Sequence, residues 1–159
     1  MPLQPPSIFP GGFPNGVVLR GMSVLGLHAG NVFWVNSATG ANGNKGTFVR
    51  PFSTLDFAFG KCTANQGDMI IVMPNHAETI TGAAGIAHDV AGVSVIGLGT
   101  GNQRPRFLMD AGTTVTYAIT AADAYLENLV FASGHSNVVA CITTTKAHSW
   151  FNSIEFENN

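Results

Sequence analysis

Charged residues are scarce in this chain of 159 residues. Asp, Glu, Lys and Arg make up 10% of it, whereas a soluble domain carries about 25%. The formal net charge is only -2. A chain so close to neutral lacks the basic surface that binds nucleic acid and the acidic surface that attracts cationic partners. Because a free monomer needs more charge than this to stay dispersed, we expect other subunits to cover much of the outside.

Long apolar runs and paired cysteines are also missing. No apolar run approaches the roughly 18 residues of a membrane-spanning helix, so no membrane partner is expected. The N-terminus lacks the Lys/Arg and apolar-core pattern of a signal peptide, which predicts a soluble chain made inside a cell without one. Cys62 and Cys141 lie far apart and outside any CxxC frame. They predict two buried free thiols rather than a disulfide or a zinc site.

The acidic residues do not form a catalytic pattern. None of the nine stands in a DxD or DD cluster, whereas glycoside hydrolysis needs two carboxylates about 5 to 10 Å apart. The sequence therefore predicts no enzyme, no catalytic residue and no cofactor. The acidic residues are Asp56, Asp68, Glu78, Asp89, Asp110, Asp123, Glu127, Glu155 and Glu157.

One short stretch, "GDMIIVMPNHAETIT" (67 to 81), could hold an ion. His76 and Glu78 are two residues apart and share a face if they lie on a strand. His88 and Asp89 follow soon after in the sequence, and zinc needs three or four ligands. Whether these four residues bind an ion stays open from sequence. The favoured interpretation is that His76 and Glu78 are turn residues and that the Glu78 side chain satisfies turn amides, so no metal site is predicted.

The composition favours β structure, since Gly, Phe, Thr, Val and Ile are abundant. The segment "NVFWVNS" (31 to 37) alternates like a strand. A short helix is predicted after Ser53 or Thr54, with Leu55, Ala58 and Phe59 as its buried stripe. The other predicted strands are Met69 to Met73, Glu78 to Thr81, Ile86 to Val90, Val93 to Leu98, Phe107 to Met109, Val115 to Thr120, Tyr125 to Phe131, Val138 to Thr143 and Ser149 to Phe156.

The segment 1–31 differs from the rest of the chain and is interpreted as an extended Pro/Gly-rich arm. Five prolines within the stretch 1–16 exclude a helix or a sheet interior. The arm also carries four apolar residues that a purely flexible tail would lack: Leu3, Ile8, Phe9 and Phe13. We expect these to bind a neighbouring subunit. A disordered leader is the alternative, and residues 32–159 are expected to form a parallel β-helix domain.

Three segments repeat the same apolar spacing: "VSVIGL" (93 to 98), "LENLVF" (126 to 131) and "FNSIEF" (151 to 156). Apolar residues stand at their first, fourth and sixth positions, so Val93, Leu126 and Phe151 are predicted to be equivalent. A β-rich unit that recurs every 20 to 50 residues or so predicts a solenoid, in which like residues stack on successive coils. An antiparallel sandwich is the alternative, but it does not require this spacing to recur.

The segments "WVNSATGANGNKGTFVRPFSTLDFAF", "NQGDMIIVMPNHAETIT" and "VAGVSVIGLGTG" resemble the opening of right-handed parallel β-helix proteins of the pectate-lyase-like superfamily. The resemblance covers residues 33 to 156. It implies an all-β fold: a short right-handed parallel β-helix with an N-terminal capping helix behind the extended arm. Many proteins with this opening are phage and viral structural proteins.

The resemblance and the missing catalytic cluster together predict a bacteriophage virion protein without enzymatic activity. The favoured assignment is a capsid decoration (cement) protein on the outer capsid surface, made in the host cytoplasm. Its expected partners are further copies of itself, as a homotrimer, and the major capsid protein, with no nucleic acid. The arm residues Leu3, Ile8, Phe9 and Phe13 would provide the anchor.

Two alternatives stay open. A short tailspike, fibre or carbohydrate-binding module would need exposed aromatics, for which Trp34, Tyr125 and Trp150 are candidates, although their strand positions favour the core or a subunit contact. A polysaccharide lyase is less favoured, because the acidic clusters of such enzymes are absent. Capsid or tail location, symmetry position, host and the exact oligomeric state do not follow from the sequence.

Overall fold

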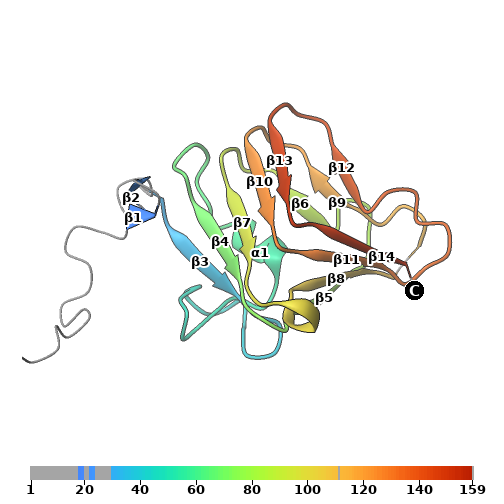
Figure 1. The fold of residues 1–159 in the computed structure, drawn as a ribbon, viewed down its shortest axis with the longest axis horizontal. Helices are drawn as coiled ribbons and strands as arrows, with labels where there is room; N and C mark the ends of the chain where they lie inside the picture. The colour runs from blue at the N-terminus through green and yellow to red at the C-terminus, as the bar shows by residue number, and fades with distance from the viewer. Residues whose placement is uncertain (1–17, 20–21, 24–29, 111, 159) are drawn as a thin grey trace, which may run out of the picture.

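The computed structural model describes residues 18–19, 22–23, 30–110 and 112–158, and it consists mainly of β-strands (Figure 1). One α-helix, α1 (Leu55–Phe59), and one 3-10 turn, η1 (Gly101–Gln103), occur within this part of the chain. The strands are β1 (Val18–Leu19), β2 (Met22–Ser23), β3 (Val32–Val35), β4 (Met69–Val72), β5 (Ala77–Ile80), β6 (Ile86–His88), β7 (Ser94–Gly97), β8 (Arg106–Met109), β9 (Tyr117–Ile119), β10 (Ala124–Glu127), β11 (Val130–Ser133), β12 (Ile142–Thr144), β13 (Ser149–Asn152) and β14 (Glu155–Asn158).

Three parallel sheets hold all strands from β3 onward (Figure 1). The first sheet has the order β13-β10-β7-β4-β3, the second β14-β11-β8-β5 and the third β12-β9-β6. From β4 on, the chain enters the first, second and third sheet in turn and then returns to the first. We call one such passage a coil. The prediction of an all-β fold with parallel strands is confirmed, whereas β1 and β2 pair antiparallel.

Columns of equivalent side chains build the core between the sheets. In the first sheet, register places Ile70, Val95 and Leu126 in one column, and all three are fully buried. In the second sheet, Phe107 and Phe131 are neighbours in a column, with ring centroids 5.6 Å apart. Each coil thus buries its apolar side chains against those of the next coil, which is how stacked repeats share one core.

A left-handed corner precedes four strands of the first sheet, β4, β7, β10 and β13. Gly67, Gly92, Asp123 and His148 all have φ between 57° and 74°, and each precedes a paired strand residue by two positions. A side chain strains this conformation unless it is short and polar, so glycine and aspartate are suited to it. The corner between β10 and β11 is likewise left-handed, at Asn128 with φ of 56°.

The register corrects the predicted repeat. Leu126 pairs with Val95 and not with Val93, so the first repeat is two residues shorter than predicted. The second predicted equivalence is confirmed, because Leu126 pairs with Phe151. A slip of two residues keeps every side chain on the same face of a strand, so alternation alone could not reveal the error.

Two predicted strands are in fact pairs of strands. Tyr125 to Phe131 contains a corner at Asn128, and Ser149 to Phe156 contains one at Ser153. Both residues have positive φ, so the chain leaves the first sheet there and enters the second. The predicted strand Val138 to Thr143 is shorter and later, since β12 begins at Ile142.

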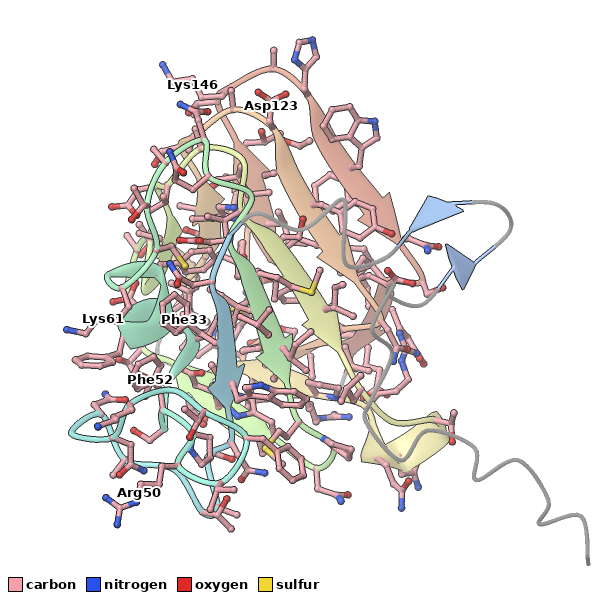
Figure 2. The ribbon with its side chains drawn as sticks, turned by 90° about the vertical axis from the view of Figure 1, so that its left-hand side faces the viewer. Phe33, Arg50, Phe52, Lys61, Asp123 and Lys146 are labelled. Carbon is pink, nitrogen blue, oxygen red and sulfur yellow. The ribbon has the colours of Figure 1, made fainter. Side chains whose placement is uncertain are left out.

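The predicted helix is present as α1, and its stripe Leu55, Ala58 and Phe59 is buried in the core. α1 contacts β3, β4 and β6, the strands at one end of the sheets. Figure 2 shows Phe33 and Phe52 on the same side as α1, where their ring centroids lie 5.8 Å apart. Thr54 is the N-cap residue but makes no side-chain capping hydrogen bond.

The arm residues Leu3, Ile8, Phe9 and Phe13 lie outside the described residues. Of the predicted arm, residues 1–31, the structure describes only β1, β2 and the last two residues. The boundary at residue 32 coincides with the first residue of β3.

Candidate functional site

The predicted pair His76 and Glu78 lies at the start of β5, next to the helix end of the core. Glu78 occupies the column that Phe107 and Phe131 fill in the following coils, so its side chain points inward. His76 precedes β5 and is 1% exposed. The Nε2 atom of His76 lies 3.0 Å from Oε2 of Glu78. The structure therefore brings these two residues together, as their spacing predicts.

Two backbone amides from an earlier segment complete this group. The Ser37 amide donates to Nδ1 of His76 at 3.0 Å, and the Leu55 amide donates to Oε2 of Glu78 at 2.9 Å. Because Nδ1 accepts a hydrogen bond, a neutral His76 ring carries its proton on Nε2 and donates it to Glu78. We call His76, Glu78 and the amides of Ser37 and Leu55 the Glu78 node.

The Glu78 node joins β5 to the loop after β3 and to the first turn of α1. Glu78 accepts a backbone amide as predicted, but the amides that His76 and Glu78 bind are not those of their own turn. They belong to residues 39 and 23 positions away in the chain. Both ring nitrogens of His76 are used within the protein, so neither offers a free lone pair to a metal ion.

His88 and Asp89 do not join the pair. His88 lies on β6 in the third sheet, is fully buried, and has Nδ1 3.2 Å from the Tyr117 hydroxyl. Asp89 is exposed at the end of that strand. The four-residue ion site that the sequence left open is therefore not assembled. Among the residues that the structure describes, no group of three or more His, Cys, Asp or Glu side chains could hold a metal ion.

Burial changes the acid–base behaviour of both His88 and Tyr117. It lowers the pKa of His88 from 6.5 to about 4, and a hydrogen bond with the Val93 backbone opposes the shift only in part. Within the described ranges, Nε2 of His88 has no partner at normal hydrogen-bond distance and angle. Burial also raises the pKa of Tyr117 well above its usual value, and the carboxylates of Glu78 and Asp56 add to this shift.

The other carboxylates near the sheets are engaged in structural contacts. Asp68 is fully buried and accepts hydrogen bonds from the amides of Asn31 and Thr63, both at 2.6 Å. Arg104 pairs with Glu155, and Arg106 on β8 pairs with Glu157 on β14. These two ion pairs reach across β11, the strand between β8 and β14, and their side chains line a hollow of about 190 Å³.

The candidate aromatics lie on the outer face of the first sheet and not in the core. Register places Tyr125 and Trp150 side by side on neighbouring strands, and Trp150 is 53% exposed. The Tyr125 hydroxyl donates to Glu127 at 2.9 Å, and Asn152 donates to Glu127 at 3.2 Å. Trp34 lies three strands away on the same face, packed edge-on against Phe48. The sequence favoured the core or a subunit contact for these residues; the core position is wrong, and the subunit contact stays a prediction.

Several large apolar side chains are exposed, although the core is well filled. At the far end of the sheets, Phe151 and Phe156 occupy core columns but have no further coil beside them among the described residues. They line an apolar hollow of about 310 Å³ with Ile142 and Ile154. Across the described ranges, the exposed large hydrophobic residues are Val32, Phe48, Val49, Val139, Trp150, Phe151 and Phe156.

Both cysteines are free, as predicted, but each is only half-buried. Burial, aided by the carboxylate of Asp68, raises the pKa of Cys62 to about 12. Burial also raises the pKa of Cys141. A thiol whose pKa is raised forms little thiolate near neutral pH, so neither residue has the character of a nucleophile.

Sequence reasoning missed two polar contacts that order the fold. Glu78 provides the hydrogen bond that Thr54 fails to give to the start of α1. Asn128 donates from its side-chain amide to the carbonyls of Gly97 and Gly99, at 2.9 and 3.0 Å, and so joins two coils at a corner. The sequence does contain a signal for Asn128, since an asparagine inside an apolar run marks a left-handed turn.

These observations define an all-β protein with parallel sheets whose polar side chains mainly support the fold. Comparison with protein-family models, with curated proteins and with solved structures gave no match. No helix within the described ranges has the length and apolar character needed to cross a membrane.

Proposed function

We propose that the chain forms a short right-handed parallel β-helix whose first coil is capped by α1. The support is the order of the sheets, which successive strands enter in turn, and the burial of Leu55, Ala58 and Phe59 at one end of the core. A helix in that place covers apolar side chains that the first coil would otherwise expose. The resemblance to pectate-lyase-like proteins, carried by residues 33 to 156, supports the same fold.

We further propose that the protein is a non-enzymatic virion protein, a capsid decoration (cement) protein of a bacteriophage. The observation that carries this is the combination of few charges with exposed large hydrophobic residues, seven of them among the residues that the structure describes. Such a surface is suited to burial against other chains, because contiguous exposed apolar patches mark interaction sites. The resemblance to phage structural proteins directs the proposal to the virion.

The proposed partners are two further copies of the chain and the major capsid protein. The outer faces of parallel sheets can pack side by side in a trimer, which would bury residues such as Val32, Trp34 and Phe48. The arm would reach the capsid through Leu3, Ile8, Phe9 and Phe13. An interface of about 1,000 Å² or more is enough for lasting attachment.

Purified virions provide the test. Mass spectrometry of gradient-purified particles from the phage that encodes the chain should detect it in a fixed ratio to the major capsid protein. Particles lacking the gene should take up the added protein, and a chain without residues 1–16 should sediment as the same oligomer without binding. Absence of the chain from virions would refute the virion proposal, and unchanged binding of the shortened chain would refute the arm as anchor.

A matched pair of arm variants sharpens that test. Replacing Leu3, Ile8, Phe9 and Phe13 with Ser removes the apolar contacts and keeps the length and the prolines. Replacing Gln4 and Ser7 with Ala changes polar positions of the same arm. We expect the first variant to lose binding and the second to retain it, because apolar burial provides most of the affinity of such a contact.

A second candidate function is carbohydrate binding, as in a short tailspike or fibre. The observation that favours it is the exposed ring of Trp150 beside the hydrogen-bonded group of Tyr125, Glu127 and Asn152. A flat aromatic face next to hydroxyl and carboxylate groups suits a sugar ring. Saturable binding on a glycan array that is lost in Trp150→Ala would favour this function over the decoration role.

A further inference from the structure

The two ends of α1 rest on two polar residues that occupy core positions. In the first complete coil, Glu78 stands in the phenylalanine column of the second sheet, and His88 stands in the column of Ile119 in the third. Glu78 accepts the amide of Leu55, the first residue of α1. The ring of Phe59, the last residue of α1, lies 4.5 Å from the His88 ring. The helix is thus held at both ends by inward polar side chains.

The environment of His88 suits a neutral imidazole and not a cation. His88 is fully buried between Phe59 and Tyr117, whose ring centroids lie 4.5 and 6.2 Å from its own. Among the described side chains, Tyr117 is its one hydrogen-bond partner, and Nε2 has none that meets hydrogen-bond geometry. A second proton on this ring would place a charge in a site without a counter-ion, which is costly to bury.

Within the described part of the chain, no carboxylate forms a hydrogen bond or an ion pair with His88. Asp56 on α1 accepts the Ala87 amide at 3.0 Å, and Glu78 is held in the Glu78 node. Lys61 lies over the Phe57 ring. The other ionisable groups on the surrounding elements are Tyr117 on β9, Cys62 after α1 and Asp89 beside His88.

We propose that His88 makes the docking of α1 acid-sensitive, so that the helix end of the core opens before the rest of the fold as pH falls. Opening separates Phe59 from His88 and admits water to the ring. The imidazole can then take a proton that it cannot hold while α1 is docked. Protonation therefore favours the open form.

The sign and size of the effect follow from linkage. The pKa of His88 is lowered from 6.5 to about 4 in the closed form. Above pH 6.5 the ring is neutral in both forms, and pH has no influence through it. Between pH 6.5 and 4 only the open form takes the proton, so the opening constant increases as pH falls, by about 30-fold at pH 5. Below pH 4 both forms are protonated and the increase stops.

Cys62 provides a built-in probe of this opening. Its thiol donates to the carbonyl of Ala58 in the last turn of α1 at 3.4 Å and is half-buried. The experiment uses the full chain with Cys141→Ser, reacted with 4,4'-dithiodipyridine between pH 7.5 and 4.5. Each rate is divided by that of glutathione at the same pH, which removes the pH dependence of the thiol itself.

We expect the normalised rate at Cys62 to increase about 30-fold from pH 7.5 to pH 5 and to change little in His88→Phe. His88→Gln, which keeps an acceptor for the Tyr117 hydroxyl, serves if the Phe variant does not fold. The exposed His148→Gln is the matched control and should retain the increase. Equal increases with and without His88 would overturn the proposal.

Hydrogen exchange separates local opening from global unfolding. Peptides covering α1 and β6 should lose protection at pH 5, while peptides covering β10 and β11 retain it. In His88→Phe the α1 peptides should stay protected at both pH values. Simultaneous loss of protection in all peptides at pH 5 would also overturn the proposal, because α1 would then not open first.

Discussion

Replacing Glu78 with alanine should strongly destabilise the protein. The substitution removes the acceptor of two donors, the amide of Leu55 and Nε2 of His76. A buried donor without a partner costs about 1 to 3 kcal/mol, so two donors cost about 2 to 6 kcal/mol. Because the Glu78 side chain is 13% exposed, water can enter the vacated space and partly satisfy the two donors. We therefore expect the free energy of unfolding to decrease by about 3 kcal/mol.

The conservative variant separates the hydrogen bonds from the charge. Glu78→Gln keeps an oxygen that can accept from the same two donors, but it loses the charge that strengthens both contacts. We expect it to cost about 1 kcal/mol. His76 cannot avoid leaving an unpaired Nε2 proton by moving that proton to Nδ1, because Nδ1 accepts the amide of Ser37.

Urea denaturation at pH 7.5, followed by circular dichroism, measures both variants against Glu127→Ala. Glu127 is a glutamate on the outer face of the first sheet, where its partners Tyr125 and Asn152 can turn to water. Its removal should cost less than about 1 kcal/mol. If Glu78→Ala were no more destabilising than Glu127→Ala, the Glu78 node would not support the fold as described.

Three further outcomes are expected. A chelator should leave the unfolding temperature unchanged, because both ring nitrogens of His76 are bound within the protein; a clear decrease would indicate a metal site. Gly97→Ala should destabilise the protein or prevent its folding, since a Cβ there would lie 2.3 Å from the carbonyl oxygen of Asn128. Gly43→Ala, whose Cβ would lie in open space, should leave the unfolding temperature unchanged. Phe131→Ala should cost about 3 to 5 kcal/mol in urea denaturation because it empties the middle of a stacked aromatic column, and a loss below about 1 kcal/mol would contradict the packing described.

The fold class was predictable because stacked coils repeat an apolar pattern. The strands β3, β4 and β7 and the stripe Leu55, Ala58 and Phe59 follow from alternation and helical spacing alone. The corners at Asn128 and Ser153 were not recognised, because the polar pairs Glu127-Asn128 and Asn152-Ser153 interrupt the apolar pattern only briefly. A left-handed corner needs only one residue to redirect the chain, and it leaves the hydrophobic pattern almost unbroken.

The candidate site was predictable only as a pair of residues. Spacing brings His76 and Glu78 to one place, and the hydrogen bond between them agrees with that. Their partners Ser37 and Leu55 could not be inferred, because the contacts bridge long loops whose path no local pattern describes. His88 was grouped with them by sequence distance alone, and the third sheet places it elsewhere.

The left-handed corners before β4, β7, β10 and β13 also indicate where the chain can tolerate added sequence. Met69, Ser94, Tyr125 and Trp150 hold the same register position, and the coil from Ser94 to Tyr125 is longer than the coils before and after it. Every one of these coils begins at a left-handed corner just before its strand in the first sheet. The longer coil also contains the exposed η1 turn between β7 and β8. A foreign peptide inserted after Gly101 would therefore be displayed at the edge of the sheets, with the registers on either side left intact.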